Sequence, residues 1–258
     1  MGNGNNATDM SGKKVFFLCP TALVQNEMAA ELIQQELEVY IVRDQGKLRR
    51  VLRKYPDSVV LICIDNGLPE KEWDAWIRTV MKDPATAAVS IGVLSGENNG
   101  ALVNKYVNDI RVTCGYVVTR LDIKRAIIQV LANLKSVDAW GMRKFLRVNT
   151  NNDINTTINM PHRGEFIKGY IKDISVAGLS CYFELDPQFE KNMLISNIQV
   201  KLQSVLLKVE GIVFGSRLDG LVKVYVIIFT QRTDPSVRVK IRKFNQLMLQ
   251  AKMDRELG

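Results

Sequence analysis

Apolar and polar positions follow different patterns in the two halves of the chain. In the first half, short apolar runs alternate with longer stretches whose apolar residues recur at helical spacing, which predicts alternating strands and helices. The apolar runs lie near residues 14–18, 39–42, 59–64, 89–94 and 116–118. The run at 59–64 is nearly continuous and β-branched, which is typical of a central parallel strand covered on both faces. Strict alternation of this kind predicts a doubly wound α/β sheet.

From Phe145 onward, the pattern changes to six or seven short alternating runs separated by turn signals such as Asp219-Gly220. Because no helical stretch interrupts these runs, they predict an antiparallel β-barrel. A last segment after Pro235 has apolar residues at helical spacing and basic residues opposite them, which predicts one terminal helix. For this helix we favour a role in closing one mouth of the barrel over binding a membrane surface or nucleic acid.

The length of 258 residues fits two domains of ordinary size. We predict a flexible tail over 1–12, an α/β domain over 13–136 and a barrel domain with its helix over 137–258. No window approaches 18 continuous apolar residues, so we expect no membrane span, and the polar start lacks the apolar region of a secretory signal. The four cysteines form no CxxC pair, which favours buried free thiols in a reducing cytosol, and we expect a cytoplasmic protein.

The net charge of +8 is unevenly distributed along the chain. Residues 1–138 hold 17 Lys and Arg against 16 Asp and Glu, whereas residues 139–258 hold 18 against 11. The excess of positive charge therefore lies in the predicted barrel. It suits an anionic ligand there, and nucleic acid would explain it as well.

Two short motifs carry the candidate chemistry, RKFLR at 143–147 and DISVAG at 173–178. A guanidinium group can donate two hydrogen bonds to the O6 and N7 edge of guanine, and its flat face can stack on a base. A carboxylate can accept hydrogen bonds from guanine N1 and N2. A serine hydroxyl and the open backbone around a glycine can approach a phosphate. Together, the motifs supply residue types suited to holding a guanine nucleotide.

The order and spacing of the two motifs resemble the PilZ domain, the bacterial receptor module for cyclic di-GMP. That family is marked by RxxxR and then by [D/N]xSxxG on the first strands of a small β-barrel, and here 25 residues separate Arg147 from Asp173. The resemblance covers about residues 139–250. It implies that Arg143 and Arg147 contact guanine by hydrogen bonds or stacking. It also implies that Asp173 accepts from a guanine edge and that Ser175 lies near a phosphate.

Each of these positions also has an ordinary structural interpretation. The arginines could lie on the surface without a ligand, Asp173 could cap a turn, and Ser175 could satisfy local backbone groups. Gly178 is structural under both interpretations, because a tight approach or a positive φ leaves no room for a side chain. The presence of both motifs in the family's order favours ligand contact for the other four residues.

The first half resembles the receiver domain of response regulators, which has flavodoxin-like topology. Asp65 follows the third predicted strand, where receivers carry the phosphoacceptor, Ser95 ends the fourth, and Arg120 stands where receivers have lysine. The acidic pair after the first strand is missing, and the chain has Leu18-Cys19-Pro20 there. Phosphoryl transfer to a carboxylate needs a divalent cation, and Mg²⁺ needs several oxygen ligands. A degenerate domain that serves dimerisation or partner docking is therefore favoured over phosphorylation.

The predicted fold class is thus α/β plus β, with a flavodoxin-like (βα)5 receiver-like domain followed by a PilZ-type six- or seven-stranded antiparallel β-barrel and a terminal helix. We expect a non-catalytic bacterial receptor for cyclic di-GMP, with neither a metal nor a cofactor beside that ligand. The sequence has a single histidine and neither GxSxG nor a paired carboxylate site.

In this interpretation, nucleotide binding changes the arrangement of the domains and the contacts with a protein partner, such as motility or envelope machinery. A homodimer through the receiver-like domain is expected by analogy only. The alternative is a response regulator phosphorylated on Asp65, whose basic β-domain binds protein or nucleic acid. The missing acidic pair disfavours phosphorylation, and the two motifs disfavour nucleic acid.

Overall fold

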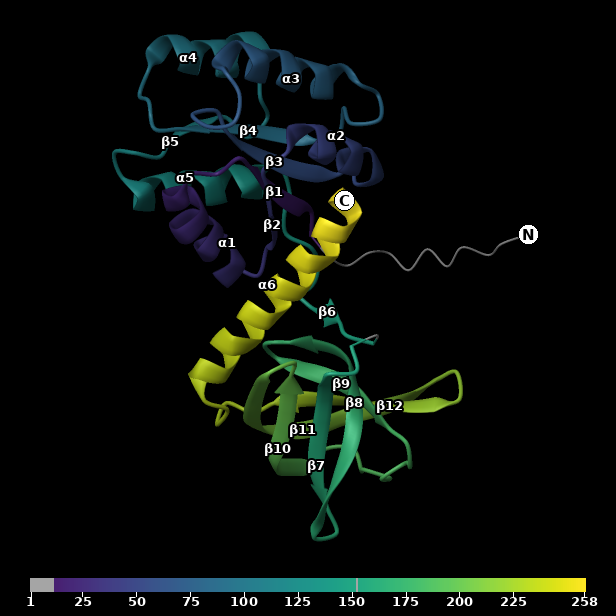
Figure 1. Ribbon diagram of the computed structural model, residues 1–258. Coiled ribbons are helices and arrows are strands. Elements are labelled where there is room, and N and C mark those ends of the chain that lie inside the picture. Colours follow the sequence, from purple (N-terminus) through teal and green to yellow (C-terminus); the bar gives the residue numbers. More distant parts are fainter. Residues whose placement is uncertain (1–11, 152) are drawn as a thin grey trace, which may run out of the picture. The chain divides into compact units, whose positions relative to one another are not determined.

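The computed structural model describes residues 12–151 and 153–258, so residues 1–11 of the predicted tail lie outside the described residues. The chain divides into two compact units (Figure 1). The second unit is Phe145–Met248, and the first unit comprises the residues before it together with Leu249–Gly258. This division differs from the boundary predicted between residues 136 and 137, because residues 137–144 and the chain's last ten residues belong to the first unit.

The first unit is built from five strands that alternate with helices. Its elements are β1 (Lys14–Leu18), the π-helical η1 (Val24–Ala29), α1 (Ala30–Gln34), β2 (Glu38–Val42), α2 (Gln45–Lys54), β3 (Ser58–Cys63), α3 (Glu70–Lys82), β4 (Ser90–Ser95), α4 (Gly100–Asn104), the π-helical η2 (Lys105–Ile110), β5 (Tyr116–Val118) and α5 (Ile123–Ser136). All neighbouring strands pair in parallel in the order β2-β1-β3-β4-β5, which is the flavodoxin-like order. The predicted (βα)5 architecture is therefore confirmed.

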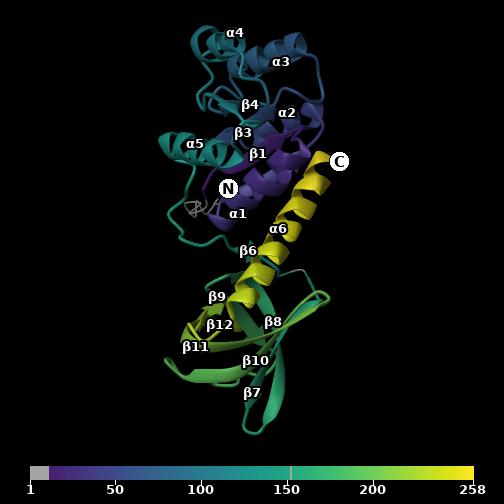
Figure 2. The same ribbon diagram turned by 90° about the vertical axis from the view of Figure 1, so that its left-hand side faces the viewer.

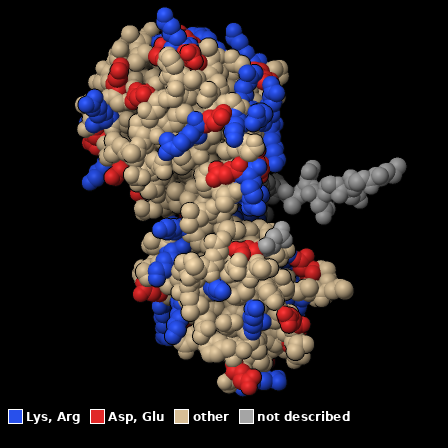
Figure 3. Space-filling model, in the orientation of Figure 1, with Lys and Arg blue, Asp and Glu red and all other residues tan. Residues whose placement is uncertain are grey.

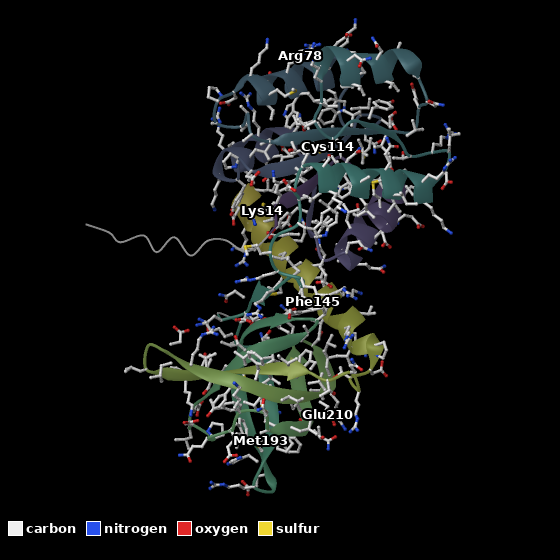
Figure 4. The ribbon with its side chains drawn as sticks, turned by 180° about the vertical axis from the view of Figure 1, so that it is seen from behind. Lys14, Arg78, Cys114, Phe145, Met193 and Glu210 are labelled. Atoms are coloured by element: carbon white, nitrogen blue, oxygen red, sulfur yellow. The ribbon has the colours of Figure 1, made fainter. Side chains whose placement is uncertain are left out.

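Helices cover both faces of this sheet, as predicted from the continuous apolar run of β3, whose six residues are all buried (Figure 1). Side chains of α2, α3 and η2 pack on one face in a core that includes Trp73 and Tyr106. Side chains of η1, α1 and α5 pack on the other face in a core that includes Met28 and Val130. Cys114, labelled in Figure 4, is buried in this second core.

The last helix, α6 (Pro235–Leu257), contributes to both compact units. In the first unit, Met253 and Leu257 are buried in the same core as α2 and α3. The side-chain amide of Gln250 donates to the carbonyl of Ile41 at 3.0 Å and accepts from its N–H at 2.9 Å. Because Ile41 lies on the edge strand β2, this pair of bonds continues the sheet with a side chain in place of a sixth strand.

The second unit is a closed antiparallel barrel. Its strands are β6 (Val148–Asn149), β7 (Thr156–His162), β8 (Glu165–Ser175), β9 (Gly178–Phe183), β10 (Leu194–Leu202), β11 (Val205–Asp219) and β12 (Val222–Phe229). The strand order is β6-β8-β7-β10-β11-β12-β9, and pairing between β8 and β9 closes a ring of six strands. The short β6 pairs with the end of β8 as a seventh strand. Figure 2 shows the strands curving around one interior.

Alternating inward side chains fill the barrel interior, including Ile158, Val200 and Tyr225, each fully buried. The first part of α6 adds Val237, Ile241 and Phe244 to the same core, among other residues. The predicted six- or seven-stranded antiparallel barrel with a terminal helix is confirmed as a fold. Among the described residues, no helix is both long enough and apolar enough to cross a membrane.

Candidate functional site

The DISVAG motif spans the end of β8, a two-residue turn and the start of β9. Ser175 and Gly178 are register partners across the turn, and Asp173 is the partner of Ser180. Side chains alternate between the interior and the outer surface along each strand. Because Ile174 belongs to the barrel core, its neighbour Asp173 is directed to the outer surface.

A β-bulge at Lys172 sets the direction of the Asp173 side chain. The register passes from the pair Ile171 and Cys181 directly to the pair Asp173 and Ser180, so Lys172 has no partner on β9. Without this extra residue, Asp173 would share the inward face with Ile171, which is buried in the core. The bulge therefore moves a carboxylate from the core to the outer face of the barrel.

The Asp173 carboxylate has one oxygen in use and one that receives no hydrogen bond from the described residues. Oδ2 accepts a hydrogen bond of 2.6 Å from the Ser180 hydroxyl. Oδ1 is buried, and Arg147 Nη1 lies 3.4 Å from it as an ion pair without a hydrogen bond. Leaving a buried acceptor without a donor costs about 1–3 kcal/mol. This oxygen is therefore a strong acceptor for a donor that a ligand supplies.

Arg147 is positioned by the short strand β6. Directly after it, Val148 pairs with Ile174 and Asn149 pairs with Asp173. The backbone is anchored in this way, whereas the Arg147 side chain is 41% exposed. Its guanidinium group therefore lies beside the carboxylate with most of its donors available to solvent or a ligand.

The first half of the RKFLR motif lies in a different compact unit. Phe145, labelled in Figure 4, begins the second unit and packs against the barrel core. Arg143 belongs to the first unit and is exposed. The structure thus brings together Arg147, Asp173, Ser175 and Gly178 of the predicted site, and the role of Arg143 stays a prediction.

Ser175 takes part in the turn of its own motif. Its hydroxyl donates to the carbonyl of Gly178 at 3.2 Å and accepts from the N–H of Ala177 at 3.3 Å. The side chain is only 3% exposed. Local backbone bonding, one of the two sequence interpretations, therefore describes Ser175 in this structure, and contact with a phosphate stays a prediction.

Gly178 is required by a close approach between two strands. It lies opposite Ile228 on β12, and a Cβ at this position would meet the carbonyl oxygen of Ile227 at 2.1 Å. No ordinary side chain fits at that distance. Of the two reasons for a glycine considered from the sequence, the structure supports the close approach and shows no positive φ here.

Two contacts of the site were missed in the sequence. Ser180 holds Asp173, and it lies two residues after Gly178, so strand alternation is a signal that could have identified it. Asn245 on α6 is 2% exposed and donates to the carbonyl of Ile174 at 3.4 Å, while its own Oδ1 has no hydrogen-bond donor among the described residues. A buried amide within the apolar stripe of α6 was the available signal.

Opposite charges near the motif partly compensate each other. Lys172 forms an ion pair with Asp219 near the end of β11, so its charge is shared. Arg163 lies at the far end of β8 from Asp173, which excludes it from the same site. On the face of the second unit in Figure 3, basic and acidic residues are interspersed rather than gathered in one patch. Specific geometry, more than bulk charge, distinguishes the site.

The receiver-like residues lie at the carboxyl edge of the parallel sheet. Asp65 accepts from the Ser95 hydroxyl at 2.6 Å and from the Gly96 N–H at 2.5 Å. It lines a cavity of about 550 Å³ together with Thr119, Arg120 and other residues. Its carboxylate is thus held by Ser95 and Gly96.

Asp65, Glu70 and Glu97 are the acidic residues that line this cavity, and the acidic pair that receivers carry after the first strand is not among them. Within residues 12–151 and 153–258, no group of three or more His, Cys, Asp or Glu side chains is arranged to hold a metal ion. In place of the acidic pair, Cys19 adopts a positive φ of 51° and its thiol donates to the Arg43 carbonyl. The segment directly after β1 thus supplies no carboxylate that could join Asp65 in holding a cation.

All four cysteines are free and buried, as predicted. Burial raises the pKa of Cys63 to about 12 and that of Cys114 to about 11. Burial also raises the pKa of Cys181, with a further contribution from the negative charge of Asp173. These thiols stay protonated at neutral pH, so they are poor nucleophiles and poor metal ligands.

Comparisons with known proteins give similarities to solved structures only. No family model and no curated protein sequence matches the chain. The PilZ domain of YcgR from Escherichia coli, determined with c-di-GMP, is 12% identical, with a TM-score of 0.37 and coverage of 44% of this chain and 95% of that one. The K. pneumonia MrkH–c-di-GMP complex is 21% identical, with a TM-score of 0.39 and coverage of 43% and 55%. The Bacillus subtilis inhibitor of motility (MotI/DgrA) is 10% identical, with a TM-score of 0.35 and coverage of 44% and 52%.

The matched part of this chain thus spans about half the length of the last two proteins. The first of these structures is a PilZ domain, the family that the two sequence motifs resemble.

Proposed function

We propose that the second unit is a receptor for cyclic di-GMP, bound on the outer surface of the barrel at the end of β8. The observation that carries the proposal is the Asp173 carboxylate, which a bulge directs outward and whose Oδ1 has no hydrogen-bond donor among the described residues. Guanine presents adjacent N1 and N2 donors, which match such an acceptor. Guanine nucleotides combine this donor edge with phosphates, which suit the nearby arginines.

Each residue of the motif pair has a role in this proposal. Asp173 accepts from guanine while Ser180 holds its second oxygen. Arg147 now covers Oδ1, so its guanidinium group turns away on binding and donates to, or stacks on, a guanine. Arg143 supplies the second guanidinium group. Ser175 and Gly178 shape the turn that fixes the position of Asp173, and Ser175 lies near a phosphate.

The proposed output is a change in protein contacts. Movement of Arg147 would reorder the segment that joins the two units, because this residue lies three positions after Lys144, where the first unit's main segment ends. The arrangement of the two units and the binding of a protein partner, such as motility or envelope machinery, would then depend on the nucleotide. The proposal involves no catalytic step, and it places the protein in the cytoplasm.

The direct test is isothermal titration of cyclic di-GMP into the full chain. We expect saturable binding that Arg143→Ala, Arg147→Ala and Asp173→Asn each weaken. Asp173→Asn keeps the shape but replaces a charged acceptor with an amide. A hydrogen bond to a charged group contributes about 1.5–3 kcal/mol, which corresponds to roughly 10- to 150-fold in Kd.

Lys208→Ala is the matched control. Lys208 lies on β11 opposite Gln199 of β10. Its replacement by alanine removes one positive charge and leaves β8 unchanged. We expect its Kd to equal that of the wild type. Binding that GTP reproduces equally well, or that Asp173→Asn leaves unchanged, contradicts the proposed site. Absence of binding by the folded wild type contradicts the function.

A further inference from the structure

Two tyrosines form a stacked pair on the outer face of the barrel. Tyr170 on β8 and Tyr182 on β9 are register partners, and their ring centroids are 5.5 Å apart with 28° between the planes. Their sequence neighbours Ile171 and Cys181 point into the core, so both rings lie on the outside. Each tyrosine is half-buried. One face of each ring is turned toward the other ring, so the pair leaves its ring edges and the remaining ring faces for further contacts.

This surface continues directly from the candidate nucleotide site. Along β9, the outward residue before Tyr182 is Ser180, the residue that holds Asp173. Two residues of a strand span about 7 Å. The tyrosine rings are therefore about one nucleoside away from the carboxylate, on the same face of the same two strands.

The cross-strand row that runs from Ser180 over β12 and β11 consists of small residues. The cross-strand neighbour of Ser180 on β12 is Val226, and the neighbour of Val226 on β11 is Gly215. A Cβ built on Gly215 would meet nothing within 4 Å, so this end of the row is open. Small residues beside the two tyrosines leave space for a ring that lies against them.

The charges around the pair suit an anionic ligand with an aromatic base. Lys168 Nζ lies 5.5 Å from the centroid of the Tyr170 ring, and Arg217 occupies the same cross-strand row as Tyr182, beyond Val224. The Tyr170 hydroxyl donates to Glu184 at 3.2 Å, and this carboxylate raises the pKa of the phenol, which keeps it neutral. The negative charge of Glu184 is thus engaged at the Tyr170 hydroxyl, whereas the positive charge of Lys168 lies over the ring.

We propose that Tyr182 and Tyr170 form a stacking platform for a purine base of the nucleotide whose guanine edge is bound by Asp173. The inference rests on the proposed function and names a second contact region for the same ligand. A ligand with two purines can reach both the carboxylate and the platform, whereas a mononucleotide can occupy only one of them. The platform therefore favours a dinucleotide over GMP or GTP.

Stacking on an aromatic side chain contributes about 1–3 kcal/mol per base, which corresponds to roughly 5- to 150-fold in Kd. Titration of cyclic di-GMP into the full chain should therefore show a weakening in this range for Tyr182→Leu. Tyr182→Phe keeps the ring and should restore affinity to within about twofold of the wild type. The absorbance decrease of the stacked purine near 260 nm should accompany binding to the wild type and to Tyr182→Phe, and it should be smaller for Tyr182→Leu.

Phe166→Leu is the matched control, because Phe166 is an exposed aromatic residue near the start of β8, far from Asp173. We expect it to bind as the wild type does. If Tyr182→Leu fails to fold, Tyr170→Leu makes the same test from the neighbouring strand. Unchanged affinity in the folded leucine variant overturns the platform while leaving the receptor function intact. Absence of binding by the wild type instead overturns the proposed function on which the platform rests.

Discussion

Replacing Gly178 with alanine tests whether the glycine of the DISVAG motif acts through strand packing. The added Cβ would lie 2.1 Å from the carbonyl oxygen of Ile227 on β12. Carbon atoms and carbonyl oxygens approach no closer than about 3 Å, so the strands would have to separate by roughly 0.9 Å. The main chain cannot yield as a flexible side chain would, because Ile227 and Ile228 are held in the β12 ladder with β9 and β11.

The cost follows from the contacts that this separation disturbs. Overpacking alone costs about 1–3 kcal/mol. The β9–β12 ladder around Gly178, and the adjoining bond of 2.9 Å from the Phe229 N–H to the Ala177 carbonyl, add about 0.5–1.5 kcal/mol for each hydrogen bond lost. We therefore expect Gly178→Ala to reduce the free energy of unfolding of the barrel by about 2–5 kcal/mol, a large share of the total for a small domain.

Hydrogen exchange followed by mass spectrometry on peptides from β9 and β12 measures this loss directly. Tryptophan fluorescence provides an internal reference, since Trp73, Trp76 and Trp140 all lie in the first unit and should report an unchanged transition. Gly215→Ala is the matched control in the same barrel, because its Cβ would point into open space. If the amide hydrogens of β9 and β12 are as well protected from exchange in Gly178→Ala as in Gly215→Ala, the close-approach argument is wrong.

Three further predictions concern the first unit and the thiols. Met253→Ala should lower the unfolding free energy of the first unit by about 2–5 kcal/mol, because Met253 is 2% exposed in its core, and tryptophan fluorescence should show an earlier transition. Mg²⁺ with beryllium fluoride should leave the midpoint of the first unit's unfolding transition unchanged, since the acidic pair is absent. A clear stabilisation would instead support phosphorylation of Asp65. The pKa of a thiol is near 9 in the unfolded chain, whereas burial raises that of Cys114 to about 11 in the folded protein. The free energy of unfolding should therefore fall as the pH rises above about 9. Cys114→Ser should make this fall with pH less steep in chemical denaturation.

Local sequence patterns predicted most of the fold because the elements bury their apolar residues at regular spacing. The run at 59–64 became the fully buried β3, and the alternating runs after Phe145 became the barrel strands. The bulge at Lys172 was not predicted, although Ile171 and Ile174 are both buried with two polar residues between them. Three-residue spacing between inward residues is the signal that a strand contains one extra residue.

The site was predictable as a set of residues but not as a geometry. The two motifs named Arg147, Asp173, Ser175 and Gly178, whereas the orphan oxygen of Asp173 depends on Ser180 and on the bulge. The division of α6 was not predicted either, although Phe244 and Met253 lie on opposite faces of the helix and enter different cores. Which core each of them enters is decided by contacts with residues far away in sequence, and periodicity carries no information about these.

The shared helix α6 has a consequence for how the chain matures during synthesis. The ribosome makes the first unit's five strands early, but Met253 and Leu257, which complete one of its two cores, come more than 100 residues after α5. Until they emerge, the apolar surface that they cover stays open and β2 lacks the Gln250 amide at its edge. The nascent first unit is thus exposed to aggregation and to chaperones during most of translation, and final closure of both units awaits a single late helix.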